Sequence, residues 1–343
     1  MTMALPDPRI LLLSSQDIVP VTILSGFLGS GKTTIIRRLL TYACDTAVIV
    51  NEFGEVGLDH LLLESADDNI ALLPGGCLCC QARGDLARAL RSLQDRSALG
   101  QAPAFRRVIV ETSGLADPGP ILQVLLSDPL RLSRYRFAGL VTTADAVLGA
   151  GQLAGHAVAQ SQVALADRIL LTKLDIAASA DRQSLVQALA RHSAAPVEDR
   201  ASDAGLERQL FAFDVGARPR FRAIGTDHGA HDGLFTAISL GWTGRVELAG
   251  LHAELTAFAL EHGETLLRLK GIVDVAGAQT PASVHAVQHL VERPRLLATM
   301  PAEPWRGIVA ICRRQARNGI ADRLGQVLRA STADRAEIHR EHA

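Results

Sequence analysis

The feature that most constrains the fold is an uninterrupted phosphate-binding loop at residues 26–33, Gly-Phe-Leu-Gly-Ser-Gly-Lys-Thr. This segment matches the pattern G-x-x-x-x-G-K-[ST] without gaps. A β-branched run, Val21–Leu24, precedes it, and an amphipathic stretch, Thr33–Thr41, follows it. The loop therefore predicts a buried strand, a tight turn and a helix, which together form the first unit of a mostly parallel α/β sheet.

The first 210 residues continue this alternation of short apolar runs and longer amphipathic stretches. Such alternation is typical of a mostly parallel sheet with helices on both faces, here a P-loop NTPase domain of the α/β class. The predicted buried strands after the loop cover residues 47–50, 108–110, 139–141 and 169–171, and further helices are expected within 86–93 and 152–166.

A second, smaller α+β domain is expected after residue 233. Residues 214–233 contain four glycines and a proline and few long apolar runs, which is typical of a linker. We therefore divide the chain into a P-loop domain (1–213), a linker (214–233) and a C-terminal α+β domain (234–343). In the last of these, strands are predicted at 234–240, 266–275, 283–290 and 307–312, and helices at 247–261 and 320–329.

Composition excludes several functional classes. The formal net charge is −1, which argues against a nucleic-acid partner, because dedicated nucleic-acid binders carry a basic excess. No apolar run approaches the roughly 20 residues of a membrane span, so no membrane association is expected. The run Ile10–Leu13 is too short for a signal peptide, and three of the five cysteines fall within four residues. Both features indicate a cytoplasmic protein with metal-binding or reactive thiols.

The phosphate-binding loop assigns roles to particular side chains. Lys32 is expected to bridge the β- and γ-phosphates, and the Thr33 hydroxyl to hold Mg²⁺. Glu111 ends a predicted strand, where a carboxylate reaches Mg²⁺ or its waters, and Gly114 follows it at a position able to meet the γ-phosphate. We therefore predict Lys32, Glu111 and Gly114 as the catalytic residues. The nucleotide-binding residues of the loop are Gly26, Gly29, Ser30, Gly31, Lys32, Thr33 and Thr34.

A base-reading motif is predicted at the end of a later strand. The sequence Thr172-Lys173-Leu174-Asp175 resembles the N-K-x-D motif of GTPases. The Asp175 carboxylate can accept two hydrogen bonds from guanine, for which adenine has no matching donors, and the Lys173 stem can lie along the base. Thr172 stands where asparagine is usual, and a hydroxyl cannot copy both ends of an amide. The expected nucleotide is GTP.

A second site is predicted from three clustered cysteines, Cys77, Cys79 and Cys80. Three thiolates suit Zn²⁺ or Cu(I) far better than Mg²⁺ or Ca²⁺, and they leave one tetrahedral position open for a further ligand. Glu52 and Glu55, in a predicted switch segment, are candidates for that fourth ligand. The remaining cysteines, Cys44 and Cys312, lie in apolar runs and are expected to be buried. The histidine pairs that offer additional ligands are His228 with His231 and His339 with His342.

Taken together, these motifs resemble the CobW-like P-loop GTPases, a family that includes zinc metallochaperones and metalloenzyme activators. The resemblance covers nearly the whole chain, and the Cys-x-Cys-Cys turn within this order of motifs is its most specific part. It rests on residues 31–34, 51–59, 76–80, 111–118 and 172–175, and more loosely on 267–271 and 285–289 of the second domain.

The resemblance implies a GTPase that binds Zn²⁺ or a similar metal at Cys77, Cys79 and Cys80 and delivers it to a client metalloprotein. GTP, Mg²⁺ and Zn²⁺ are the ligands it implies. Many members carry a dense histidine tract between the domains; this chain has only His228 and His231 there.

Two other functions fit the same motifs. One is an ATP-dependent small-molecule kinase with a structural zinc site, for which Thr172–Asp175 would have no role. The other is a metal-sensing regulatory module whose partner binding depends on metal but not on hydrolysis. The thiolates alone do not choose among Zn²⁺, Co²⁺ and Ni²⁺.

Overall fold

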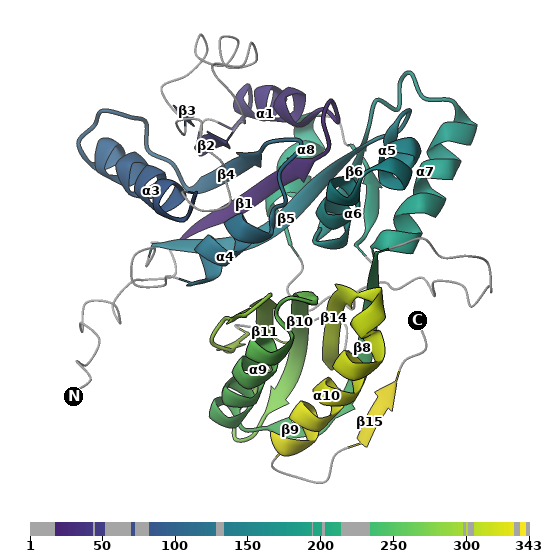
Figure 1. Cartoon of the computed structure of the whole chain (residues 1–343). Helices are drawn as coiled ribbons and strands as arrows, with labels where there is room; N and C mark the ends of the chain where they lie inside the picture. The colour runs from purple at the N-terminus through teal and green to yellow at the C-terminus, as the bar shows by residue number, and fades with distance from the viewer. Residues whose placement is uncertain are drawn as a thin grey trace.

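The computed structural model describes residues 18–43, 45–51, 70–72, 82–127, 134–193, 195–200, 203–213, 234–297, 300, 305–332 and 337–340. The described chain forms two layered units, with the P-loop unit above the C-terminal unit in Figure 1.

The first unit is built on a parallel sheet that contains seven strands among the described residues, in the order β3-β2-β4-β1-β5-β6-β7. Each neighbouring pair in this sheet is parallel. The five runs predicted as strands are all present. The strands are β1 (Val19–Gly26), β2 (Thr46–Asn51), β3 (Ile70–Leu72), β4 (Arg107–Thr112), β5 (Tyr135–Asp145), β6 (Arg168–Thr172) and β7 (Val197–Asp199).

Helices cover both faces of this sheet, as its apolar strands require (Figure 1). One face packs against α1 (Lys32–Leu40) and α8 (Asp203–Phe211), with Ile35, Leu39 and Leu206 in the core. The opposite face carries the larger core. Its helices are α3 (Ala82–Ala98), α4 (Gly119–Ser127), α5 (Gly149–Gly155), α6 (Ala157–Ala164) and α7 (Ser179–His192).

The C-terminal unit is a mainly antiparallel sheet, ordered β12-β11-β10-β14-β8-β15, with β13 beside β11 and β9 beside β10. The helices α9 (Leu248–His262) and α10 (Arg317–Ala330) pack on one face, and a 3₁₀ turn, η2 (Arg314–Ala316), precedes α10. The strands are β8 (Phe235–Thr243), β9 (Arg245–Val246), β10 (Leu266–Val275), β11 (Ala282–Val287), β12 (Leu290–Val291), β13 (Arg295–Leu296), β14 (Gly307–Arg313) and β15 (Glu337–Arg340).

The other face of this second sheet meets the P-loop unit. Successive side chains of a strand point to opposite faces of the sheet, so β10 contributes residues both to the face covered by helices and to the face that meets the P-loop unit. Leu269 enters the core beneath the helices, whereas Arg268 and Lys270 pair with Asp167 of the P-loop unit. Leu267 and Val287 join the large core of the first unit; Leu267 can do so because the strand register shifts between Leu266 and Arg268 and interrupts the alternation. The two units are therefore joined by shared apolar contacts as well as by charge.

Two predicted elements differ from the structure. The single helix expected at 152–166 is divided into α5 and α6, because His156 adopts an extended backbone and its ring stacks on Phe27 of the phosphate-binding loop at 4.6 Å. The strand predicted at 283–290 turns back instead, since Gln288 has φ 50 between β11 and β12. The linker at 214–233 lies outside the described residues.

None of the helices in the described ranges is both long enough and apolar enough to cross a bilayer.

Cys312 is buried in β14, as expected for a cysteine in an apolar run. Burial raises the pKa of its thiol to about 11. Because only the thiolate reacts, we expect Cys312 in the native protein to label roughly a hundredfold more slowly at pH 8 than an ordinary exposed cysteine. Thiol titration of the native and unfolded parent, with Cys312→Ala as the control, measures this. If that variant loses a fast-reacting thiol, Cys312 is accessible. Cys44 lies outside the described residues.

Candidate nucleotide site

The phosphate-binding loop connects the carboxyl end of β1 to the first turn of α1. Gly31 is the N-cap of α1 and has φ 93, a left-handed conformation in which a side chain would be strained. The loop therefore presents its backbone N–H groups and the positive end of the helix dipole to the same space. This arrangement forms an anion site from the local sequence alone.

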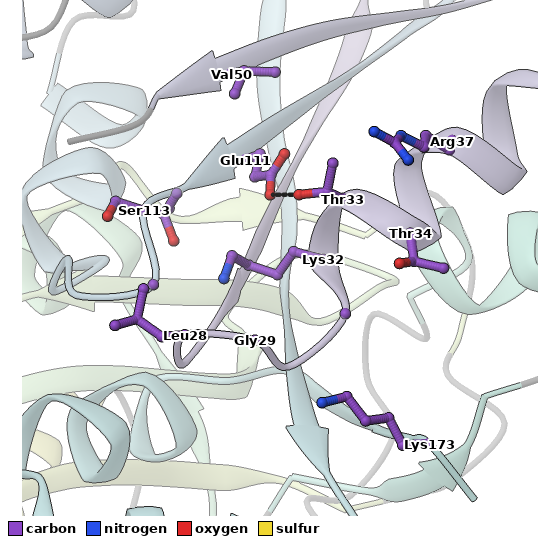
Figure 2. Close-up of a pocket in the computed structure, with 13 residues that line it drawn as sticks. Leu28, Gly29, Lys32, Thr33, Thr34, Arg37, Val50, Glu111, Ser113 and Lys173 are labelled. Carbon is purple, nitrogen blue, oxygen red and sulfur yellow. Dashed lines mark hydrogen bonds between the residues drawn. The ribbon is translucent and has the colours of Figure 1, made fainter. Parts of the chain in front are cut away.

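A cavity of about 290 Å³ opens over this loop (Figure 2). It is bounded by the loop, the start of α1, the end of β4 and the turn after β6. These elements meet because the carboxyl ends of parallel strands share one edge of the sheet. The residues that line the cavity are Leu28, Gly29, Gly31, Lys32, Thr33, Thr34, Arg37, Val50, Glu111, Thr112, Ser113, Gly114 and Lys173.

Lys32 is largely buried at the floor of the cavity. Its ammonium donates hydrogen bonds to the carbonyl oxygens of Gly26 at 2.8 Å and Phe27 at 3.3 Å. These bonds hold the cation over the loop. A phosphate entering the cavity would therefore meet a positive charge already in position.

Thr33 and Glu111 both line the cavity, and their side chains are in direct contact, as the dashed line in Figure 2 marks. The Thr33 hydroxyl donates to Oε1 of Glu111 at 3.0 Å, although the two residues are 78 positions apart. A hydroxyl and a carboxylate are hard oxygen ligands of the kind that Mg²⁺ prefers. The donor set therefore fits the predicted magnesium site.

Gly114 lies directly against the phosphate-binding loop. A Cβ built at this position would come within 2.7 Å of the Leu28 backbone nitrogen, which is closer than side chains tolerate. Glycine therefore allows the segment after β4 to approach the loop and to line the cavity. This is the position that the sequence predicted for a residue near the γ-phosphate.

Thr172 is buried at the end of β6, behind the cavity. Its hydroxyl lies 2.8 Å from the carbonyl oxygen of Ser30 and 3.2 Å from that of Ala144. The hydroxyl thus ties the end of β6 to the phosphate-binding loop. The Ser30 side chain is held in turn by Thr143 at 2.6 Å. Thr172 therefore contacts the loop rather than the cavity.

Lys173 and Asp175 lie in the turn that follows Thr172. Lys173 has φ 58 and lines the cavity, and its ammonium donates to the buried Asp145 carboxylate at 2.6 Å. Burial alone would raise the pKa of Asp145, but this hydrogen bond and those from the Val147 and Leu148 N–H groups hold it below its usual value. Asp145 therefore stays ionised and fixes Lys173. Asp175 is exposed beside it.

The sequence matches two family descriptions over most of its length. Residues 20–197 match the CobW/HypB/UreG nucleotide-binding domain, and residues 235–328 match the C-terminal domain of the cobalamin synthesis protein CobW. The chain belongs to the CobW family. The resemblance drawn from the motifs is thereby confirmed.

Several curated relatives support this membership. The chain is 35% identical over 281 residues to the zinc chaperone YjiA of Escherichia coli, an alignment that covers 79% of this chain and 87% of the relative. It is 36% identical over 150 residues to the zinc chaperone CobW of Sinorhizobium, covering 41% of each. A crystal structure of Zn(II)-bound YjiA GTPase has a TM-score of 0.62 at 27% identity and covers 90% of this chain and 99% of the other. The predicted fold is therefore confirmed.

Among predicted metal ligands of this CobW-family chain, Cys77, Cys79, Cys80, Glu52 and Glu55 all lie outside the described residues, as do His228, His231 and His342. His339 lies in β15. No group of three histidine, cysteine or carboxylate side chains that could hold a metal occurs among the residues the structure describes. The thiolate site therefore stays a prediction from the sequence.

Two residues near the cavity were not predicted from the sequence. Arg37 lines the cavity one helical turn after Thr33, and its i+4 spacing on α1 is a signal that could have identified it. Asp145 ends β5, the strand beside β1. Its place at the carboxyl end of a predicted strand was the corresponding signal, but the pairing with Lys173 joins residues 28 positions apart.

Proposed function

We propose that this CobW-family chain is a GTP-hydrolysing metallochaperone. It binds GTP in the cavity over residues 26–33 and Zn²⁺ or a similar transition metal at Cys77, Cys79 and Cys80, and it delivers the metal to a client metalloprotein. The observation that carries this proposal is the arrangement of Lys32, Thr33 and Glu111 around one cavity, in a chain whose sequence also contains a Cys-x-Cys-Cys motif.

The chain's own residues account for nucleotide binding and hydrolysis. The loop amides and Lys32 bind the phosphates, and Lys32 balances the charge that develops as the γ-phosphoryl group is transferred to water. We assign the Gly114 backbone N–H to the γ-phosphate, because Gly114 lines the cavity beside the phosphate-binding loop. Thr33 and Glu111 would hold Mg²⁺, which when bound would neutralise phosphate charge.

Base selection is assigned to the turn after β6. Asp175 accepts the two N–H bonds of guanine, and the Lys173 stem, fixed by Asp145, lies along the base. Thr172 supports this site without lining the cavity, because its hydroxyl donates to the Ser30 carbonyl and so connects the turn to the phosphate-binding loop. With threonine in place of the usual asparagine, a side-chain hydrogen bond therefore still joins the base-binding turn to the phosphate-binding loop.

The metal and client parts of the proposal rest on chemistry and on relatives. Three thiolates bind soft or borderline metals and leave a position open for exchange. Relatives are named zinc chaperones and, in Schizosaccharomyces pombe, a zinc-regulated GTPase metalloprotein activator; the last is 33% identical over 175 residues, 48% of this chain and 41% of the relative. We place the protein in the cytoplasm, because clustered thiols suit a reducing compartment.

Competition between GTP and ATP tests the nucleotide assignment. We expect GTP to bind at least tenfold more tightly than ATP, and Asp175→Asn to remove most of that preference, because an amide cannot accept both guanine N–H bonds. Thr172→Val is the matched control: it removes the hydroxyl behind the cavity and should weaken both nucleotides alike. Equal affinity of the parent protein for ATP and GTP would exclude guanine selection.

A further inference from the structure

Gln162 is fully buried on α6, and its amide points at the segment that follows β4. Its Nε2 donates to the carbonyl oxygens of Gly114 at 3.1 Å and Ala116 at 3.0 Å. Both partners are acceptors, so only the amide's NH₂ group can face them, which fixes its orientation. One side chain therefore holds two carbonyls of the Gly114–Ala116 segment, 46 to 48 residues away.

That segment forms part of the cavity wall and lies directly against the phosphate-binding loop. Gly114 packs on the Leu28 backbone so closely that no side chain fits between them. A shift of the segment would therefore change the distance between Gly114 and the γ-phosphate. Since charge-stabilising donors must sit within about 3 Å of the reacting group, a small displacement costs rate more than binding.

The C-terminal unit holds the carboxyl end of the same helix, close to Gln162. Arg268 of β10 donates to the carbonyl oxygen of Leu165, three residues after Gln162. Its guanidinium also contacts the Asp167 carboxylate at 2.8 Å, and Lys270 pairs with the same carboxylate. Asp167 in turn accepts from the Leu140 N–H at 2.8 Å. The end of α6 is thus fixed between β5 and the second sheet.

A second contact holds the downstream side of the segment. Helix α4 begins at Gly119, where the Asp117 carboxylate caps its first N–H at 2.9 Å. One turn later, Gln123 donates to Gln288 of the turn between β11 and β12. The residues from Gly114 to Pro118 therefore lie between two helices, α6 and α4, and the C-terminal unit contacts both.

We propose that Gln162 is a positioning residue for GTP hydrolysis, because it holds Gly114 in place beside the cavity. We further propose that the C-terminal domain fixes Gln162 itself, through the hydrogen bond from Arg268 of β10 to the end of α6. The inference rests on the proposed GTPase function. It assigns the second domain a direct part in turnover rate, separate from any contact with metal or client.

The test compares two buried glutamines of one helix. Gln160 is also buried on α6, but its Nε2 donates to the carbonyl oxygen of Leu153 in α5, away from the cavity. We expect Gln162→Met in the full-length protein to lower kcat for GTP by about tenfold or more, with GDP affinity changed less than about twofold. Gln160→Met should keep kcat within about twofold of the parent, while lowering the melting temperature comparably.

The inference is overturned if Gln162→Met retains the parental kcat, or if Gln160→Met loses as much. Should Gln162→Met fail to fold, Gln162→Asn and Gln160→Asn give the same comparison, because asparagine keeps the amide but is one methylene too short to reach both carbonyls. A parent protein that does not hydrolyse GTP at all would instead refute the proposed function, so the two failures are distinguishable.

A double-mutant cycle tests the role of the second domain. Arg268→Met leaves the Asp167–Lys270 pair in place, so no isolated charge is created by the change. We expect Arg268→Met alone to lower kcat, and to lower it little further when combined with Gln162→Met, because both changes release the same segment. Two results would show that the second domain does not act through Gln162. One is an unchanged kcat in Arg268→Met, and the other is a double variant whose fold loss in kcat equals the product of the two single losses.

Discussion

Replacing Lys32 by alanine is expected to abolish measurable GTP hydrolysis and to weaken nucleotide binding by at least a hundredfold, while the fold stays intact. Lys32 is buried beneath the cavity, and the Gly26 and Phe27 carbonyls already hold its ammonium over the loop. A preorganised cation of this kind costs no reorganisation when charge develops, and removal of one such group typically costs 10²–10³ in rate.

Single-turnover hydrolysis of GTP and calorimetric titration with GDP measure this effect. Arg38→Ala is the control, because it removes a positive charge from an exposed position of the same helix that does not line the cavity. The variants should melt within a few degrees of the parent in the absence of nucleotide. Normal turnover by Lys32→Ala would refute the assignment of the cavity as the nucleotide site.

The second large effect concerns the thiolates. We expect Cys77, Cys79 and Cys80 together to bind one Zn²⁺ ion, and the Cys77/Cys79/Cys80→Ser triple variant to lose that binding. Because thiolates must be deprotonated to bind metal, zinc affinity should fall as the pH drops through the range in which they protonate. Competition with a chromogenic chelator at several pH values measures both effects.

The nucleotide should alter this zinc affinity. In the sequence, the three cysteines lie between the phosphate-binding loop and β4, which contains Glu111. We expect Glu52 or Glu55 of the intervening segment to supply the fourth ligand in one nucleotide state and to withdraw it in the other. Loops ordered by a γ-phosphate are a common basis for such switching. Linkage requires that zinc change GTP affinity by the same factor, about 5–150-fold for a coupling of 1–3 kcal/mol.

How much of this could be predicted from the sequence depends on the distance along the chain over which a feature is encoded. The phosphate-binding loop is local: its glycines, the preceding strand and the following helix are contiguous, so the motif predicted the geometry found around Lys32. Glu111 was also predictable, because parallel strands bring their carboxyl ends to one edge. The Thr33–Glu111 hydrogen bond follows from that rule.

Features that depend on distant partners were not predictable. Thr172 departs from the usual guanine motif, and only the structure places its hydroxyl on the Ser30 carbonyl, 142 residues away. The break between α5 and α6 follows Gly155, which is a local signal, but the stacking of the His156 ring on Phe27 that accompanies it joins residues 156 and 27. The pairing of Asp167 with Arg268 joins two units across 101 residues. No periodicity in a single sequence encodes such contacts.

The measurement that tests the central claim most directly is a zinc titration of the full-length protein with GDP bound and with a non-hydrolysable GTP analogue bound. A metallochaperone driven by GTP should give one zinc site with affinities that differ at least fivefold between the two states, and the Cys77/Cys79/Cys80→Ser variant should lose that site. The same zinc affinity in both nucleotide states, or zinc binding by the triple variant as tight as in the parent, would contradict the account.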